Sequence, residues 1–511
     1  MAWPNLYTLS FWAIIVAWWY ATWCDHWKGS HARTRARVDY ARCAELHNKI
    51  LDLGTRKQLA LGDGSNNPNP TKPQVRQHPN WFEHWGKRAE AVRHMLSPDL
   101  VAFLEQAGYA GDGHSFFYYA NGIASPEVMF ATQAAGMAED PADWTRYVTL
   151  YSANLLASHP DGLVFDQKKG LAVMQMDIMD GFVTQNGRQK WYPLEVVLGQ
   201  WLDMIEMRKI VAVAEGARTR SEKFDPWTIV GYSERQFEET LEVWEQLLSA
   251  IETRIPNYTR SNDSATLFDD SEIDLEDAGV LPGFVSKFVA KARRPAFNHI
   301  APGLGLRDSE SFAFQQPFRA VPLVYLYNRP EHPGSPKIQF PILLFASSED
   351  LTYDAPPSSG DESIYNQNDV PLPFEKPWSQ VRSYPAGLYF TRTDQGDQNV
   401  FEDGVQLVLP FGIGGRGYAR TADGARFGEN LEAKHDQPEG HDSHHELFQL
   451  GYSPFVASHK VRLVQVLRVW VGLVESGAWQ VGPEGVLGGM EKWREADTWW
   501  HWKKYVVPMS W

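Results

Sequence analysis

The hydrophobic pattern first divides the chain into one long apolar stretch and a body in which apolar and polar positions alternate. Residues 6–23 are almost wholly apolar, and no charged side chain occurs between Met1 and Cys24. About 20 apolar residues are enough for a helix to cross a bilayer. Tryptophan and tyrosine at the end of the stretch suit the aromatic belt of a membrane interface. The pattern predicts a single transmembrane anchor over residues 1–27 that contacts the lipid bilayer through residues 6–23.

The charges around this stretch predict its orientation. Basic residues follow it and none precedes it: Lys28, Arg33, Arg35, Arg37 and Arg42. A cleaved signal peptide, the main alternative, normally begins with a basic region. Lys and Arg beside a span stay on the cytoplasmic side, so we expect a cytosolic body on the endoplasmic reticulum membrane. Two glycosylation sequons, at Asn257 and Asn262, point the other way, and we give the charge asymmetry more weight.

The periodicity of the remaining chain predicts an α+β body of two lobes. Residues 28–80 form a basic juxtamembrane helix and a linker rich in Gly, Asn and Pro. Residues 81–256 predict a mainly helical lobe with a β-meander, where Asn186-Gly187 is a strong hairpin signal. Residues 257–280 form an acidic linker. Residues 281–511 predict a β-rich lobe with C-terminal helices, because Pro and Gly separate its apolar runs.

Three segments give sharper local predictions. Ser233 and Gln236 form a capping box ahead of helical periodicity, so a helix should begin there. A second helix is expected where apolar residues recur at helical spacing: Trp144, Tyr147, Val148, Tyr151 and Leu155. The tryptophan-dense segment 491–505 predicts the last helix of the chain.

Composition and charge narrow the classes of function. Apolar residues make up 43% of the 511 residues and charged residues 22%, which is typical of a chain with a packed core. The net charge of −15 argues against a nucleic-acid partner, because such proteins need a basic face. The two cysteines, Cys24 and Cys43, lie near the start of the sequence. The body therefore has no disulfide framework and no cysteine-based zinc site.

Candidate chemistry is concentrated between residues 435 and 459. Five of the sixteen histidines fall there, interleaved with four carboxylates: His435, Asp436, Glu439, His441, Asp442, His444, His445, Glu446 and His459. Imidazole and carboxylate groups bind transition metals and carry protons near neutral pH. We expect catalytic roles for His441, His444, His445 and Glu446. A transition-metal ion, if one binds, should be held by His441, His444 and His459.

Two motifs resemble known sites but depart from them. His445-Glu-Leu-Phe-Gln449 lacks the second histidine of the zinc-protease motif His-Glu-x-x-His, which removes that interpretation. Gly412-Ile-Gly-Gly-Arg-Gly417 matches Gly-x-Gly-x-x-Gly, yet the glycines that follow it are unfavourable for the helix that a dinucleotide site needs. We expect a glycine loop between strands, and a solvated polar loop remains the alternative for the histidine cluster.

These observations favour a membrane-anchored enzyme that acts on an apolar small molecule. Oxidation or cyclisation in a biosynthetic pathway would suit an anchored catalyst with an aromatic-rich body. The alternative is a non-catalytic anchored scaffold. Its tryptophan-rich end would then form an apolar patch for a partner or the membrane: Trp493, Trp499, Trp500, Trp502 and Trp511.

Overall fold

The computed structural model describes residues 38–62, 78–109, 115–130, 144–154, 161–177, 180–181, 190–213, 224–258, 265–269, 273–321, 338–352, 372–375, 377–394, 401–427, 444–457 and 459–511. The expected membrane span at residues 6–23 lies outside this part. None of the helices that the structure describes is long and apolar enough to cross a bilayer. Helices and antiparallel sheets occur together, which confirms the α+β body.

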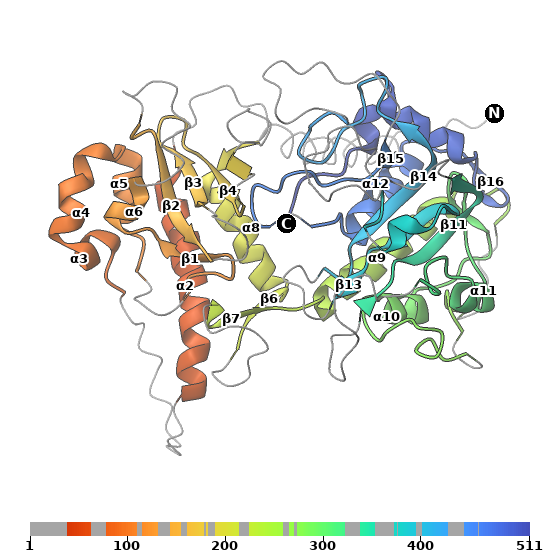
Figure 1. Ribbon diagram of the computed structural model, residues 1–511, viewed down its shortest axis with the longest axis horizontal. Coiled ribbons are helices and arrows are strands. Elements are labelled where there is room, and N and C mark those ends of the chain that lie inside the picture. Colours follow the sequence, from red (N-terminus) through yellow and green to blue (C-terminus); the bar gives the residue numbers. More distant parts are fainter. Residues whose placement is uncertain are drawn as a thin grey trace, which may run out of the picture.

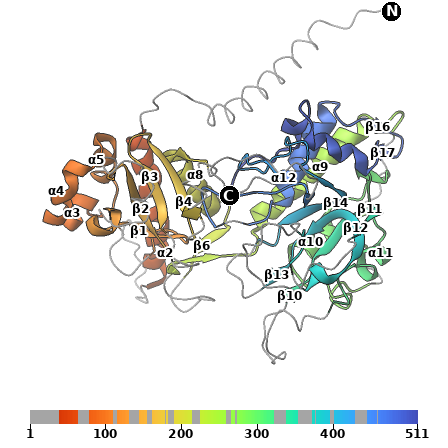
Figure 2. The same cartoon turned by 45° about the horizontal axis from the view of Figure 1, so that its top comes forward.

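The described residues form two lobes, each with its own hydrophobic core (Figure 1). The first core is built mainly from residues between Cys43 and Ile229, and the second from residues between Phe237 and Val507. The helix that follows Ile229 packs in the second core, whereas the sequence grouped it with the first lobe. Figure 2 shows the same two groups of elements from a second direction.

The first lobe contains an antiparallel meander whose five strands neighbour one another in chain order. They are β1 (Ala120–Ile123), β2 (Tyr147–Ala153), β3 (Gly162–Asp166), β4 (Leu171–Gln175) and β5 (Tyr192–Pro193). Successive side chains point to opposite faces of a sheet. Leu163 and Phe165 accordingly join the lobe's core, whereas Val164 packs with Tyr147 and Trp191. Strands β3 and β4 lie within the region where a β-meander was expected, and the Asn186-Gly187 turn lies outside the described residues.

Several helices and one small hairpin complete the described part of the first lobe. The helices are α2 (Tyr40–Gly62), α3 (Trp81–Trp85), α4 (Lys87–Val92), the 3₁₀ helix η1 (Arg93–Met95), α5 (Pro98–Leu104), α6 (Pro126–Phe130) and α8 (Leu194–Glu206). The hairpin pairs β6 (Ile210–Ala212) with β7 (Trp227–Ile229). Local chemistry sets their boundaries: Asn80 and Glu83 form a capping box at α3, and Ser97 caps α5 ahead of a proline at its first position.

The second lobe is organised around an eight-stranded sheet in the order β15-β14-β12-β11-β9-β8-β17-β16. Its strands are β8 (His299–Ala301), β9 (Leu304–Gly305), β11 (Ile342–Thr352), β12 (Ser383–Phe390), β14 (Val405–Ile413), β15 (His444–Glu446), β16 (Val481–Gly482) and β17 (Gly485–Val486). All pairs are antiparallel except β17 with β8. A separate pair joins β10 (Ile338–Gln339) to β13 (Thr393–Asp394).

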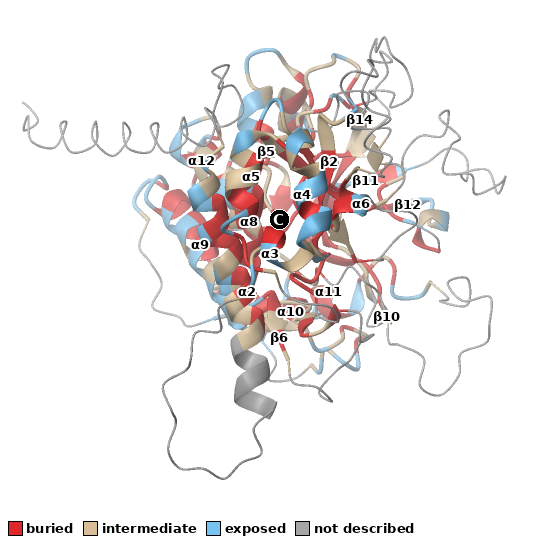
Figure 3. Cartoon of the chain, turned by 90° about the vertical axis from the view of Figure 1, so that its left-hand side faces the viewer, coloured by how far each residue is buried: buried red, intermediate tan, exposed pale blue. Residues whose placement is uncertain are grey.

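Two long helices pack side by side in this lobe (Figures 1 and 2). They are α9 (Glu234–Glu252) and α12 (Leu463–Glu475), and the shorter helices are α10 (Phe284–Lys291), α11 (Ser309–Phe314) and the 3₁₀ segments η6 (Trp378–Gln380), η7 (Met490–Asp497) and η8 (Trp502–Tyr505). The capping box of Ser233 and Gln236 begins α9, as predicted. Figure 3 shows that much of α9, like much of α8, is buried. The apolar stripe of α9, which includes Trp244 and Ile251, faces the core.

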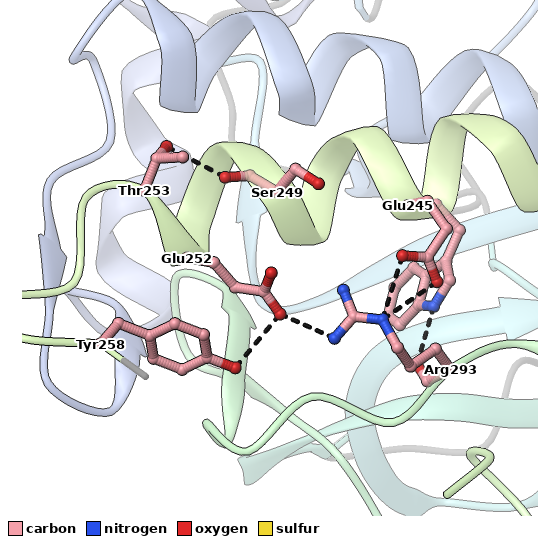
Figure 4. Close-up of polar contacts among 7 residues, drawn as sticks. Glu245, Ser249, Glu252, Thr253, Tyr258 and Arg293 are labelled. Carbon is pink, nitrogen blue, oxygen red and sulfur yellow. Dashed lines mark hydrogen bonds and ion pairs between the residues drawn. The ribbon is translucent and has the colours of Figure 1, made fainter. Parts of the chain in front are cut away.

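Ionic contacts join the C-terminal half of α9 to the chain that follows α10 (Figure 4). The guanidinium of Arg293 donates to Glu245 at 3.0 Å and to Glu252 at 2.7 Å. The Tyr258 hydroxyl donates to the same Glu252 carboxylate at 3.1 Å. The side chain of Glu252 is only 8% exposed, so its charge depends on these partners.

Two expected helices are wrong in detail. Residues 147–153 form strand β2 instead of a helix, and Trp144 is exposed rather than part of a core stripe. The run Tyr-Val-Thr-Leu-Tyr favours a strand, and it pairs with β1 and β3 on both sides. The segment 491–505 forms the two 3₁₀ segments η7 and η8, interrupted near Thr498.

Candidate functional site

The structure places His459 apart from His444 and His445, with which the sequence grouped it. His435 and His441 lie outside the described residues. His444 and His445 are consecutive residues of β15, so their side chains point to opposite faces of the sheet. Within the described part of the chain, no three His, Cys, Asp or Glu side chains could hold a metal ion together.

The residues of β15 have separate surroundings. The ring of His444 lies 5.1 Å from that of Phe427. Burial lowers the pKa of His445, which lies against the backbone of β14. Glu446 accepts hydrogen bonds from Gln406 Nε2 at 2.8 Å and from Lys460 Nζ at 3.1 Å. Its carboxylate is thus bound by an amide and an ammonium group, and in these contacts it does not orient an imidazole.

His444 and His459 lie near opposite ends of β14. His444 pairs with Ile413, the last residue of that strand. The chain just after His459 meets the other end, because Val405 N donates to Val461 O at 2.7 Å. An extended strand of this length spans about 25 Å. The structure therefore does not bring these two expected metal ligands together.

His459 instead belongs to a buried polar group at the junction of the two lobes. We call it the junction cluster, and it comprises Lys209, Phe401, Asp403, His459 and Arg462. All five are at most 7% exposed. Lys209 lies between α8 and β6 of the first lobe, and the other four residues directly precede β14 and α12 of the second lobe.

The imidazole of His459 has a defined tautomer. Its Nδ1 lies 2.7 Å from the carbonyl oxygen of Lys460, so Nδ1 carries the proton and donates it. Nε2 is then a bare acceptor, and it has no hydrogen-bond partner among the described residues. Burial lowers the pKa of His459 to about 3, with smaller contributions from the charges of Arg462 and Lys209. The imidazole is neutral at physiological pH.

An aromatic ring separates His459 from the ammonium group of Lys209. The rings of Phe401 and His459 are stacked, with centroids 3.7 Å apart and planes 6° apart. Lys209 Nζ lies 4.1 Å from the centroid of Phe401. Because His459 covers one face of this ring, the ammonium must lie over the other, where a cation–π interaction is favourable. Lys209 Nζ also donates to Gly231 O at 2.7 Å.

Asp403 and Arg462 complete the cluster, and each has one buried atom without a described partner. Asp403 Oδ2 accepts a long hydrogen bond of 3.5 Å from Gln236 Nε2, whereas Oδ1 has no partner in the described chain. Burial raises the pKa of the Asp403 carboxyl, and the charges of Lys209 and Arg462 oppose that shift. The guanidinium of Arg462 lies 3.9 Å over the ring of Trp511, and its Nε is similarly unpartnered there.

Segments distant in sequence hold the two lobes together beside this cluster. Phe401, Phe455, Val456 and Trp511 come from the second half of the chain but pack in the first core. Trp511 Nε1 donates to Asp203 Oδ2 at 2.7 Å, and Trp201 Nε1 donates to Phe455 O at 2.6 Å. Figure 1 shows the end of the chain between the lobes. The junction is therefore a packed part of the molecule.

The glycine loop that the sequence compared with a dinucleotide site is bound by a side chain of the protein itself. Asp497 accepts hydrogen bonds from the backbone N–H groups of Gly414, Arg416, Tyr418 and Ala419, at 2.7 to 3.0 Å. No helix follows the loop within residues 414–427. The arrangement is the expected glycine loop, with a carboxylate where an anion-binding loop would hold phosphate.

The sequence pattern singles out His459 but not its partners. Lys209, Asp403 and Arg462 carry no motif, and they meet only because segments far apart in the chain fold together. Comparison of the chain with protein-family models, with curated proteins and with solved structures finds no match. Chemically, the junction cluster combines a bare imidazole nitrogen with buried charges of both signs.

Proposed function

We propose that this protein is a membrane-anchored enzyme that acts on an apolar small molecule, with the junction cluster as its active site. The anchor is the apolar stretch at residues 6–23, and the body faces the cytosol at the endoplasmic reticulum. Sites for small molecules occur preferentially between lobes or domains, where aromatic walls surround a few polar groups. Phe401 and Trp511 are such aromatic residues at the junction.

The observation that carries this proposal is the bare Nε2 of His459. Buried polar atoms in folded proteins nearly always have a hydrogen-bond partner, so a buried nitrogen without one needs an explanation. Ionisable groups with shifted pKa values gather at functional sites. The junction cluster contains three such groups: the pKa of His459 is lowered, that of Asp403 is raised and that of Arg462 is lowered, each mainly by burial.

The geometry supports a reaction that begins with proton transfer to this nitrogen. Nε2 accepts a proton from a hydroxyl or an acidic C–H group of the substrate, which leaves an anion on the substrate. The positive charges of Lys209 and Arg462 favour that anion. They also disfavour the imidazolium ion of His459, as its lowered pKa indicates. Return of the proton to another atom of the same substrate balances the reaction, as in an isomerisation or a cyclisation.

A transition metal held by His441, His444 and His459 would provide a different chemistry. Of these residues, His459 offers a bare nitrogen, while His444 lies near the other end of β14. Elemental analysis of the full-length protein distinguishes the two proposals. About one equivalent of metal, lost in His459→Gln, favours the metal site. A protein that contains no metal and still forms a product that depends on His459 favours proton transfer.

Ligand binding at the junction can be measured without knowing the substrate. Full-length protein is purified in mild detergent, and the apolar molecules that co-purify are extracted and identified by mass spectrometry. We expect a compound with an acidic hydroxyl or C–H group that is retained by the exposed-surface control His94→Gln and lost from His459→Gln. The same compounds in equal amount on both variants would contradict binding at the junction.

A further inference from the structure

Two segments far apart in sequence form one continuous surface beside the glycine loop. The backbone of residues 414–419 is bound by Asp497, which fixes it against the segment 498–504. The ring of Tyr418 meets that of Trp499 at 5.9 Å, edge to face. The guanidinium of Arg420 lies 5.0 Å over the ring of Trp502. We call residues 414–420 and 498–504 together the aromatic–basic surface.

This surface exposes two adjacent tryptophans. Trp499 is 63% exposed and Trp500 is 80% exposed, the two most exposed large apolar side chains in the described part of the chain. The tryptophans that the sequence grouped with them behave differently, because Trp493 and Trp511 are buried. The predicted patch is therefore narrower than expected and centres on Trp499 and Trp500.

The charges of this surface are all of one sign. Its two segments contain four basic residues, Arg416, Arg420, Lys503 and Lys504, and no Asp or Glu. The neighbouring Asp497 is buried, and its carboxylate is bound by backbone N–H groups. The whole chain carries a net charge of −15, so two adjoining segments without a carboxylate depart locally from its average. The other carboxylate that closely precedes the second segment, Glu495, is paired with Lys492 at 2.6 Å.

We propose that the aromatic–basic surface docks on the headgroup region of an anionic membrane, as a contact additional to the predicted anchor. Tryptophan prefers the boundary between hydrocarbon and headgroups, where its ring is apolar and its N–H group can donate. Lysine and arginine near the bilayer gain from the negative potential of anionic lipids. This contact involves only residues 414–420 and 498–504, so it depends neither on the anchor nor on the junction cluster.

A third exposed tryptophan provides a matched control. Trp144 is 60% exposed, close to the value for Trp499. Among the described residues it has no second exposed tryptophan beside it, and the nearby Arg146 is paired with Asp166 at 2.8 Å. An isolated exposed aromatic residue is ordinary on a protein surface. Trp144 therefore shows how far an isolated exposed tryptophan responds to a membrane.

The test uses the full-length protein with a single reactive cysteine. Cys24 is replaced by Ser, Cys43 is buried and does not react, and an environment-sensitive dye is attached through Trp500→Cys or Trp144→Cys. The protein is mixed with phosphatidylcholine vesicles with or without phosphatidylserine. We expect a blue shift and quenching by spin-labelled lipid at position 500, stronger with phosphatidylserine and weaker at high salt, and no change at position 144.

The lysines provide the second arm of the test. Replacing Lys503 and Lys504 by Gln should lower the docking equilibrium about five-fold for each lysine on anionic vesicles. An unchanged dye at position 500, or an equal response at position 144, would overturn the proposal. A response to single-stranded RNA in place of vesicles would overturn it as well, because aromatic and basic groups also bind nucleic acids. Flotation with vesicles measures insertion of the anchor separately. A failure of the anchor can therefore be told apart from a failure of the aromatic–basic surface to dock.

Discussion

Two buried histidines of this protein share a lowered pKa but differ in their contacts. His47 donates from Nε2 to Gly108 O at 2.7 Å, and its Nδ1 accepts from the Tyr151 hydroxyl at 2.7 Å. Both of its nitrogens are therefore bonded, and His47 fits a structural role in the first core. His459 has only its Nδ1 bonded within the described chain. The missing hydrogen bond at Nε2 therefore makes His459 a candidate base, whereas His47 is a residue of the core.

At the residue scale we predict a pH dependence of stability. Burial lowers the pKa of His459 to about 3 and that of His47 to about 4, from an ordinary value near 6.5. Between these values the unfolded chain binds protons that the folded chain does not. The free energy of unfolding should therefore fall as the pH falls from about 6.5 towards 4, by up to about 1.4 kcal/mol per pH unit for each histidine.

The measurement is urea unfolding of the wild type, His459→Gln and His94→Gln at pH 7 and pH 5. His459→Gln should lose less stability on acidification than the wild type, because one of the two buried histidines is gone. His94 is exposed, so His94→Gln should follow the wild type. An equal loss of unfolding free energy between pH 7 and pH 5 in all three proteins would contradict a neutral buried His459.

Residue identity alone could not reveal the rest of the site. Composition directed attention to the histidines between residues 435 and 459, and His459 was among the expected metal ligands. Lys209, Asp403 and Arg462 stand in ordinary contexts, next to a helix or a strand. Their importance comes from burial and mutual proximity, which depend on how segments from both halves of the chain pack.

At the scale of elements, local sequence patterns predicted where an element begins better than whether it is a helix or a strand. The capping box of Ser233 and Gln236 marked the start of α9, because both of its hydrogen bonds lie within four residues. The apolar residues of strand β2 fit helical spacing, so the sequence pattern predicts a helix there, and this prediction is wrong. What decides its type is pairing with β1 and β3, which periodicity does not report.

Helix α9 should depend on its ionic contacts with Arg293 (Figure 4). We predict that Arg293→Met lowers the free energy of unfolding by about 3 kcal/mol, because it leaves the buried charge of Glu252 without its cation. The matched control is Arg88→Met, whose partner Glu127 and own side chain are both more than half exposed. Urea unfolding should show little change for the control. Equal effects of the two substitutions would contradict the prediction.

The glycine loop after β14 should depend on Asp497. We predict that Asp497→Asn lowers the free energy of unfolding by about 3 kcal/mol, because a neutral amide cannot accept four backbone N–H groups. Limited proteolysis should then cut within residues 414–420. Glu491→Gln is the control, since Glu491 is exposed and pairs only with Arg494 among the described contacts. An uncut loop of wild-type stability would refute this role for the carboxylate.

At the scale of the whole molecule, the two lobes share residues across their boundary. The sequence predicted two lobes from composition, but the cores separate between Ile229 and Phe237, and later segments return to the first core. Trp511 is the clearest case, with its ring under Arg462 and its Nε1 bonded to Asp203. These contacts join segments that are far apart in the sequence, and no local sequence pattern predicts them.

Loss of this contact should weaken the coupling of the lobes. We predict that Trp511→Ala lowers the free energy of unfolding by about 3 to 5 kcal/mol, because it empties a buried site and removes the ring under Arg462. Trp500→Ala is the control, and it should change stability by less than about 0.5 kcal/mol because Trp500 is 80% exposed. Chemical unfolding followed by circular dichroism compares the two. Equal stability of both variants would contradict the packing role of Trp511.

The central claim is that the junction cluster catalyses a reaction through Nε2 of His459. The most direct measurement compares the small-molecule profiles of cells that produce equal amounts of folded wild type, His459→Gln or His94→Gln. We expect a new apolar product with the wild type and with His94→Gln, and at least about a 100-fold decrease of that product with His459→Gln. The same product at the same level from His459→Gln would contradict the claim.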